Sequence, residues 1–148
     1  MTRRITLLTL LILILLPTIL SGCASGSQSN DNHNGLKMAL LSDMPDEVKQ
    51  SSVSVQDAYR FNVANPELMK EIPCYCGCGD MGHTSNYACY VQDDSNGKIT
   101  FDSHALGCSI CVDITVDAMR MLKEGKSVGE IKQSIDDTYA KFGPSNIE

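Results

Sequence analysis

The stretch that decides the fold class is residues 108–142, CSICVDITVDAMRMLKEGKSVGEIKQSIDDTYAKF. In its first half, apolar side chains recur every three or four residues, which predicts an amphipathic helix over residues 108–124. Gly125 is a typical residue just after a helix end, and Ser127 with Glu130 has the sequence pattern of a capping box. The second helix then carries an apolar stripe made of Ile131, Ile135, Tyr139 and Phe142. We therefore expect two antiparallel helices joined at that glycine.

The rest of the domain is expected to be less regular. Residues 53–63 carry apolar side chains at helical spacing after two serines that can act as N-caps, which predicts another helix. Asn96-Gly97 is a strong turn signal between two short runs, residues 87–91 and 98–101, and predicts a small hairpin. Glycines near the cysteines predict a tight, irregular loop, because glycine adopts positive φ without strain. The expected fold class is a small, mainly α domain with a Cys-rich loop, a short β-hairpin and a C-terminal helical hairpin.

The N-terminus has the organisation of a secretory leader. Two arginines precede an apolar run over residues 5–16, which is too short to span a bilayer comfortably. LSGC at residues 20–23 then resembles the bacterial lipobox. The resemblance implies cleavage before Cys23, a diacylglycerol on its sulfur and an acyl chain such as palmitate on its amine; an uncleaved signal anchor is the alternative. We expect a lipid-anchored protein on the extracytoplasmic side of the cell membrane.

The chain is thus expected to have three segments, a lipoprotein signal peptide (1–22), a lipid-anchored flexible tether (23–45) and a Cys-rich domain (46–148). The tether is rich in Ser, Asn and Gly, and its His33 is interpreted as a solvated linker residue. Without the leader, 10 basic side chains stand against 18 acidic ones. Attachment to an anionic bilayer therefore rests on lipid rather than on a basic patch. The same charge balance argues against nucleic-acid binding, which needs a basic face.

Six cysteines remain once Cys23 is assigned to the anchor. PCYCGCG, residues 73–79, places Cys74, Cys76 and Cys78 at alternate positions of one loop. A disulfide between cysteines two residues apart is strained, whereas three thiolates in one short loop can converge on a soft ion. Thiolates select Cu(I) by softness and Zn²⁺ by its tetrahedral preference. Copper is therefore the first expectation and zinc the second.

Further soft donors follow in two stretches. GHTSNYAC, residues 82–89, adds an imidazole and a thiol, and HALGCSIC, residues 104–111, adds another imidazole and a C-x-x-C pair at the start of the long helix. At that position the helix dipole favours a thiolate on Cys108. The predicted metal ligands are Cys74, Cys76, Cys78, Cys89, Cys108, Cys111, His83 and His104. This set is enough for one tetrahedral site with redox partners or for a small two-metal cluster.

Two other interpretations of the same cysteines stay open. Cys108 and Cys111 are spaced as a redox dithiol, in which one thiolate attacks a partner's disulfide and the other resolves it. Six cysteines in a small extracytoplasmic domain also fit three structural disulfides of an interaction domain, each adding roughly 2–4 kcal/mol. No sequence pattern of a hydrolase, a metalloprotease or a phosphate loop is present. We therefore assign no catalytic residues beyond that pair, and expect a metal ion and a protein partner for metal or thiol transfer.

The chain resembles the bacterial PCYCGC-motif lipoproteins over roughly residues 58–142. The matching pieces, in order, are AYRF (58–61), PCYCGCG (73–79), GH (82–83), Cys89, DSHALGCSICVDIT (102–115) and EGKSVGEI (124–131). This resemblance implies lipid anchoring and a role for the predicted ligands, without naming the metal. Residues 108–143 are also similar to the cytochrome c maturation thioreductases, with a C-x-x-C opening a helix and an EGKS turn before a second helix. That similarity implies a dithiol that exchanges with a partner's cysteines.

Overall fold

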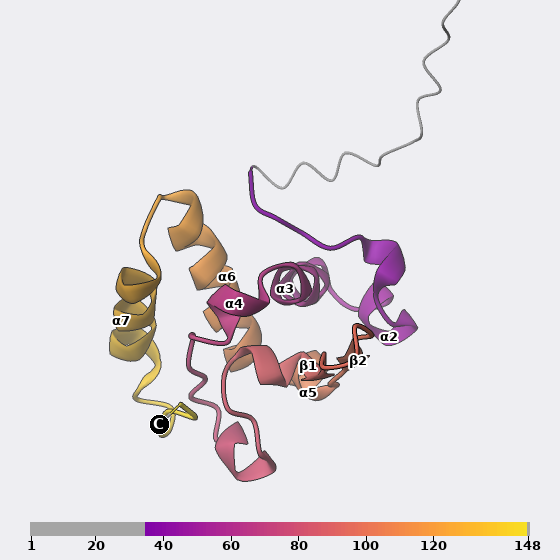
Figure 1. The fold of residues 1–148 in the computed structure, drawn as a ribbon. Coiled ribbons are helices and arrows are strands. Elements are labelled where there is room, and N and C mark those ends of the chain that lie inside the picture. Colours follow the sequence, from indigo (N-terminus) through magenta and orange to yellow (C-terminus); the bar gives the residue numbers. More distant parts are fainter. Residues whose placement is uncertain (1–34, 148) are drawn as a thin grey trace, which may run out of the picture. The chain divides into compact units, whose positions relative to one another are not determined.

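The computed structural model describes residues 35–147, and these form a mainly α domain (Figure 1). Its longest elements are helices α3 (Val53–Ala64), α6 (Ser109–Lys123) and α7 (Val128–Tyr139). Short helical turns connect them: η1 (Leu41–Asp43), α2 (Asp46–Lys49), α4 (Pro66–Met69), η2 (Cys78–Met81), η3 (Tyr87–Cys89) and α5 (His104–Gly107). The predicted fold class is confirmed. Within residues 35–147, no helix is both long and apolar enough to cross a membrane.

Helix α6 is the centre of the domain, because α3 packs on one part of it and α7 on another (Figure 1). Gly125, which follows the C-terminal end of α6, has a φ of 78°, a conformation that favours glycine. Ser127 and Glu130 cap each other's backbone N–H groups at the start of α7, so the predicted capping box is confirmed. The facing side chains Ile114 and Ile131 are fully buried. The predicted helical hairpin is therefore present, at the predicted turn.

Phe142 departs from the prediction that it would continue the apolar stripe of α7. The helix ends at Tyr139, which is buried, while Phe142 is 53% exposed. Their rings still lie 6.1 Å apart, in a tilted arrangement. The 3.6-residue period applies only while the backbone is helical, so a residue beyond the last turn leaves the buried face.

The segment before residue 46 packs against the domain. Met44 is only 3% exposed, and Leu36, Met38 and Leu41 contact the core. The Ala39 N–H donates to the Arg60 carbonyl, and the Arg60 Nε donates back to the Ala39 carbonyl at 2.8 Å. The packed part of the chain thus includes residues that the sequence had assigned to the tether.

The predicted hairpin is present, but its strands are short and the first begins later than expected, because Tyr87–Cys89 form the 3₁₀ helix η3. Strands β1 (Val91–Asp93) and β2 (Thr100–Phe101) pair antiparallel, with an irregularity after the Val91–Phe101 pair. Next to it, the rings of Tyr59 and Tyr90 meet edge to face, with centroids 4.8 Å apart. The Tyr59 hydroxyl donates to the Asp102 carbonyl at 2.7 Å. The hairpin is thereby joined to α3, and it delivers the chain to the histidine and cysteines that follow Asp102.

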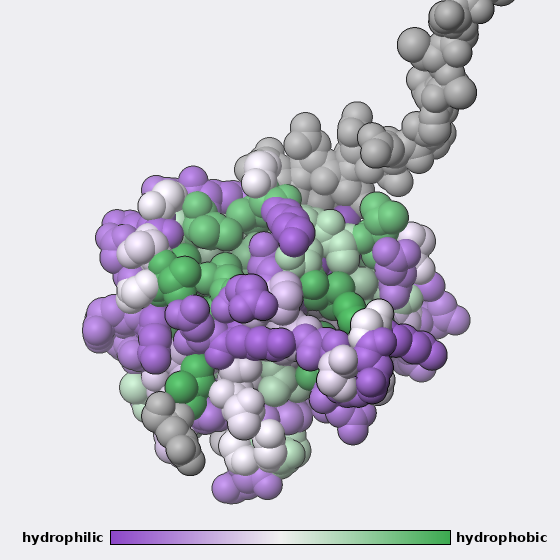
Figure 2. All heavy atoms as spheres, viewed as in Figure 1, coloured by the Kyte–Doolittle hydropathy of each residue, from purple (hydrophilic) through white to green (hydrophobic). Residues whose placement is uncertain are grey.

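Polar residues dominate the face drawn in Figure 2, with apolar residues scattered among them. The large apolar side chains that stay exposed within residues 35–147 are few and come from different elements: Leu40, Val53, Met81, Val116 and Phe142. Single exposed apolar residues are normal for a folded domain and indicate no interaction site by themselves.

Candidate metal centre

The cysteine loop is shaped by two glycines with positive φ. Gly77, with φ of 83°, lies between Cys76 and Cys78, and Gly82, with φ of 86°, ends η2. An L side chain at these angles is strained, so the chain can reverse here at low cost only with glycine. These turns bring the loop back over the N-terminal end of α6, where Cys108 is the N-cap residue and Cys111 lies in the first turn.

Three sulfurs form a nearly equilateral triangle at this junction. The Sγ atoms of Cys74 and Cys76 are 3.4 Å apart, those of Cys74 and Cys111 3.5 Å, and those of Cys76 and Cys111 3.6 Å. Sulfurs bound to one tetrahedral ion at about 2.3 Å would be about 3.8 Å apart, so the triangle needs to open by only a few tenths of an ångström. All six cysteines from Cys74 to Cys111 are free thiols in the structure. Loop and helix together therefore present one face of a metal coordination sphere.

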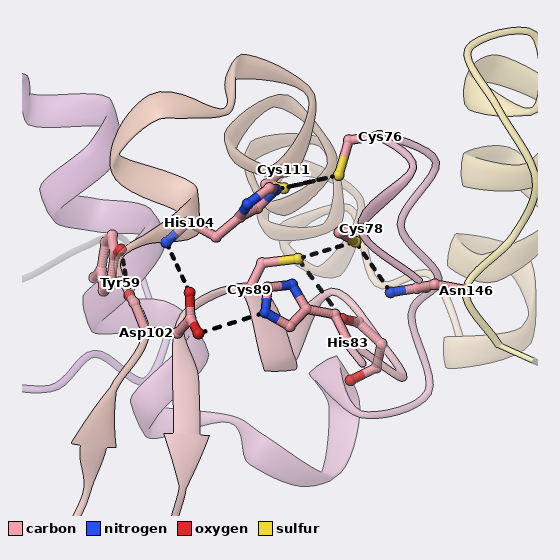
Figure 3. A network of polar contacts seen from close by, with 10 residues as sticks. Tyr59, Cys76, Cys78, His83, Cys89, Asp102, His104, Cys111 and Asn146 are labelled. Atoms are coloured by element: carbon pink, nitrogen blue, oxygen red, sulfur yellow. Dashed lines mark hydrogen bonds and ion pairs between the residues drawn. The ribbon is translucent and has the colours of Figure 1, made fainter. Parts of the chain in front are cut away.

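The remaining donors lie close to this triangle, and Figure 3 shows the side chains of Cys76, Cys78, Cys89, Cys111 and His104 gathered at one place. Three sets of four ligand atoms lie within 4.8 Å of one another: Cys74, Cys76, Cys89 and Cys111; Cys76, His104, Cys108 and Cys111; and Cys76, Cys78, Cys89 and His104. The His104 Nε2 is 3.4 Å from the Cys76 sulfur, and the sulfurs of Cys78 and Cys89 are 3.5 Å apart. All six predicted cysteine ligands and one predicted histidine thus gather at one place.

The cluster has a buried floor and a more accessible rim. Cys74, Cys89 and Cys111 are fully buried, and Cys78 is nearly so. The rim consists of Cys76, His104 and Cys108, which are only partly buried. A surface hollow of about 300 Å³, lined by Cys108, Ser109, Asp113 and part of α3, lies beside it. An ion would therefore meet the rim before it reached the floor.

The thiols of the metal-free cluster shift one another's pKa values in opposite directions. Hydrogen bonds from neighbouring thiols, first that of Cys111, lower the pKa of Cys74 far below that of a free thiol. Hydrogen bonds within the cluster raise the pKa of Cys111 and of Cys89, because each thiol donates its proton to a neighbouring sulfur and is stabilised in the protonated form. Burial, ahead of its sulfur neighbours, raises the pKa of Cys76. A bound cation would replace these protons, since only thiolates coordinate.

A buried polar network that the sequence did not reveal positions Cys111. The Asn86 amide donates to the Cys111 carbonyl at 3.2 Å, and its oxygen accepts from the Thr115 hydroxyl at 2.8 Å. The Tyr90 hydroxyl lies 2.9 Å from that of Thr115, and the Asn86 N–H donates to the Ile72 carbonyl just before the cysteine loop. Asn86 thus links the two halves of the site. No local pattern identifies such an asparagine, because its partners are distant in sequence.

Asp102 holds both histidines. Its Oδ1 accepts from the main-chain N–H of His104 at 2.7 Å, and its Oδ2 lies 3.4 Å from the His83 Nε2. The two imidazole rings meet edge to face, with centroids 5.1 Å apart. Unlike His104, His83 belongs to none of the four-donor sets within residues 35–147, and its buried Nδ1 has no hydrogen-bond partner there. The aspartate therefore fixes the backbone that carries His104 into the cluster, and His83 lies outside the cluster, next to Asp102.

The C-terminal tail fastens the cysteine loop from outside. The Asn146 side-chain oxygen accepts from the Cys74 N–H at 2.7 Å, and the Asn146 N–H donates to the Cys74 carbonyl. The Asn146 Nδ2 also lies 3.5 Å from the Cys78 sulfur. A Cβ at Gly143 would come within 2.9 Å of the Tyr75 carbonyl oxygen, so only glycine permits this close approach. The predicted lipidation site, Cys23, lies outside the described residues, as does His33.

Fold and site together define the class: a mainly α domain built around a Cys/His cluster that could hold a metal ion. The chain belongs to the family described as "Protein of unknown function with PCYCGC motif", whose model matches residues 12–145. The predicted family resemblance is thereby confirmed. No curated protein and no solved structure matches the chain.

Proposed function

We propose that this protein is a lipid-anchored, extracytoplasmic lipoprotein that binds a soft metal ion, copper(I) first and zinc second, through its Cys/His cluster. The observation that carries the proposal is the triangle of Cys74, Cys76 and Cys111, with Cys89 within 4.8 Å of each of its sulfurs. Three thiol groups from two distant stretches meet there without disulfide bonds between them. Capture, delivery and detoxification of copper are the roles that such a site would serve.

Copper(I) is preferred because the donor set is dominated by sulfur. Every four-donor set contains at least three cysteines, and the first contains no other ligand type. Soft thiolates suit Cu(I), whereas Zn²⁺ accepts sulfur, nitrogen and oxygen ligands in a tetrahedron. The buried floor would also shield a bound Cu(I) ion from water and oxidants. Asp102 would help to position His104 through the backbone, because its Oδ1 accepts from the His104 main-chain N–H.

The metal part of the proposal is tested on reduced protein prepared without oxygen. Cu(I) and Zn²⁺ are offered in turn, free ions are removed by gel filtration, and bound metal is measured by elemental analysis. We expect retained Cu(I) that a weak chelator does not remove, and loss of it in Cys74→Ala/Cys111→Ala. A Cys23→Ala protein serves as the soluble control and should bind as the wild type does. Metal-free protein with six titratable thiols would overturn this part.

The anchor is proposed from the leader alone. Cleavage before Cys23 and acylation would give several acyl chains, enough for stable attachment, since each buried CH₂ contributes about 0.8 kcal/mol. Residues 24–35 would then hold the domain off the bilayer. Mass spectrometry of the membrane-extracted protein should show a lipid mass on the peptide that begins at Cys23. Cys23→Ala should release the protein, and a mature chain without lipid would refute the anchor.

Thiol–disulfide exchange by Cys108 and Cys111 is the second candidate function. It is favoured by their arrangement, because Cys108 is partly exposed at the N-cap of α6 and Cys111 lies buried behind it within 4.8 Å. An accessible attacking thiol with a shielded resolving thiol is typical of exchange proteins. A Cys111→Ser protein should then trap a mixed disulfide on Cys108 with a partner. If no partner is trapped and the pair shows no redox couple, this candidate fails.

A further inference from the structure

We propose that the cluster holds at least two ions at once, and that the sulfurs of Cys76 and Cys111 bridge them. One ion would lie on the floor with Cys74 and Cys89, and the other on the rim with His104 and Cys108. This inference rests on the proposed metal-binding function and specifies its stoichiometry and its second site. A single ion bound on the floor would not explain why His104 and Cys108 also lie at the cluster.

The number of donors is the first argument. A tetrahedral ion takes four ligands, whereas six thiols and one imidazole lie within the three overlapping sets. If one ion used the all-cysteine set, Cys78, Cys108 and His104 would be left beside it without a metal. Buried or half-buried donors of that kind are costly to hold together unless a cation or a proton compensates them. A second ion accounts for Cys108 and His104, and Cys78 stays outside both sites.

Sharing of ligands is the second argument. Cys76 belongs to all three sets, and both Cys76 and Cys111 belong to the floor set and to the rim set. A thiolate sulfur has three lone pairs, so it can bind two metal ions at the same time, whereas an imidazole nitrogen has one and cannot. The two shared residues are both cysteines, and the one histidine of these two sets is on the rim alone. The ligand chemistry therefore matches the pattern that bridging requires.

Geometry is the third argument. The two shared sulfurs lie 3.6 Å apart. With metal–sulfur bonds of about 2.3 Å, two ions bridged by both sulfurs would form a flat rhomb and lie about 2.9 Å from each other. The Cys74 sulfur lies 3.5 Å from the Cys111 sulfur, and the His104 Nε2 lies 3.4 Å from the Cys76 sulfur. Each ion thus has a terminal ligand of its own beside the shared pair.

The experiment is anaerobic Cu(I) titration of the reduced protein, with native mass spectrometry for stoichiometry and X-ray absorption for metal–metal distances. We expect at least two Cu(I) per chain and a copper–copper vector near 2.9 Å. The variant His104→Ala/Cys108→Ala removes only rim ligands and should lose at least one ion and the short vector while keeping a sulfur-bound ion. Cys78→Ala is the matched control, because Cys78 belongs to neither of the two sets, and should keep the short vector.

The outcomes separate this inference from the function on which it rests. One Cu(I) per chain, or two without the short vector, would overturn the bridged pair and leave the proposed function standing. A short vector that survives in His104→Ala/Cys108→Ala would place the second ion elsewhere and would also overturn it. Absence of any bound Cu(I) or Zn²⁺ would overturn the proposed function and this inference with it. Circular dichroism of each variant checks that the fold is retained.

Discussion

The helical hairpin and the cysteine loop are held together by different forces. In the hairpin, α6 and α7 bury apolar side chains such as Ile114, Ile131 and Ile135 against each other and against α3. Around residues 73–89, regular structure is limited to two short 3₁₀ helices. Beside the buried rings of Tyr75 and Tyr87, individual hydrogen bonds and sulfur contacts connect the chain to its neighbours. A region held by many small apolar contacts tolerates the loss of one of them, whereas a region held by a few polar contacts does not. The loop is therefore the part whose order should depend on a bound ion.

The two regions share helix α6. Its first turn carries Cys111, and its later turns pack against α7. The hairpin can thus form without metal and present the helix end to the loop. The following predictions test how independent the two regions are.

Removing a buried side chain from the hairpin should have the largest effect. Ile131 is fully buried on α7, and Ile131→Ala is expected to lower the free energy of unfolding by roughly 2–5 kcal/mol, because a cavity adds to the lost transfer energy. Ile131→Val should cost less, about 0.5–1.5 kcal/mol. Urea unfolding of the reduced, metal-free protein measures both. Metal bound per folded chain should stay at the wild-type value; a parallel loss of metal would show that the regions are not independent.

Breaking the network behind Cys111 should affect both regions. Asn86→Ala removes two buried hydrogen bonds, one to the Cys111 carbonyl and one from the Thr115 hydroxyl, and should cost roughly 0.5–1.5 kcal/mol for each. It should also weaken Cu(I) binding in a chelator competition, since Asn86 joins the loop to α6. Asn62→Ala is the control, because Asn62 is equally buried and contacts Thr115 from α3. If both variants weaken binding equally, Asn86 does not position the site.

Removing the cap of α7 should have a smaller effect, confined to the hairpin. The Ser127 hydroxyl accepts from the Glu130 N–H, so Ser127→Ala should cost about 1 kcal/mol in the free energy of unfolding. Ser127→Asp supplies another cap acceptor and should restore most of the loss. Thermal unfolding of the metal-free protein measures the series. A failure of aspartate to rescue would mean that the cap is not what the serine contributes.

Loosening the C-terminal tail should have the smallest effect, confined to the loop. Asn146→Ala removes the acceptor of the Cys74 N–H and should cost roughly 0.5–1.5 kcal/mol. Hydrogen exchange at the Cys74 amide should become faster, while amides of α7 keep their rates. Asn146→Asp keeps an acceptor oxygen and should preserve slow exchange. Unchanged exchange in Asn146→Ala would show that the tail does not fasten the loop.

The sequence alone predicts the helical hairpin better than it predicts the arrangement of the cysteine loop. The helical hairpin was predicted correctly, with its turn at Gly125 and its capping box. These features depend on residues that are close together in the sequence, so a local pattern identifies them. Phe142 was misplaced because a periodic pattern does not say where a helix stops. The packing of residues 36–44 was missed because short apolar segments acquire their order only from the surface they meet.

For the site, the sequence by itself determined the donors: their number, their softness and their restriction to three short stretches, because ligand chemistry belongs to side chains. Only the tertiary structure decided which of them meet. It placed Cys76 3.6 Å from Cys111, put His104 at the cluster and left His83 beside it on Asp102. It also brought in Asn86 and Asn146, whose roles lie entirely in distant contacts. Distances between residues far apart in a chain depend on how its helices pack, and no local pattern encodes them.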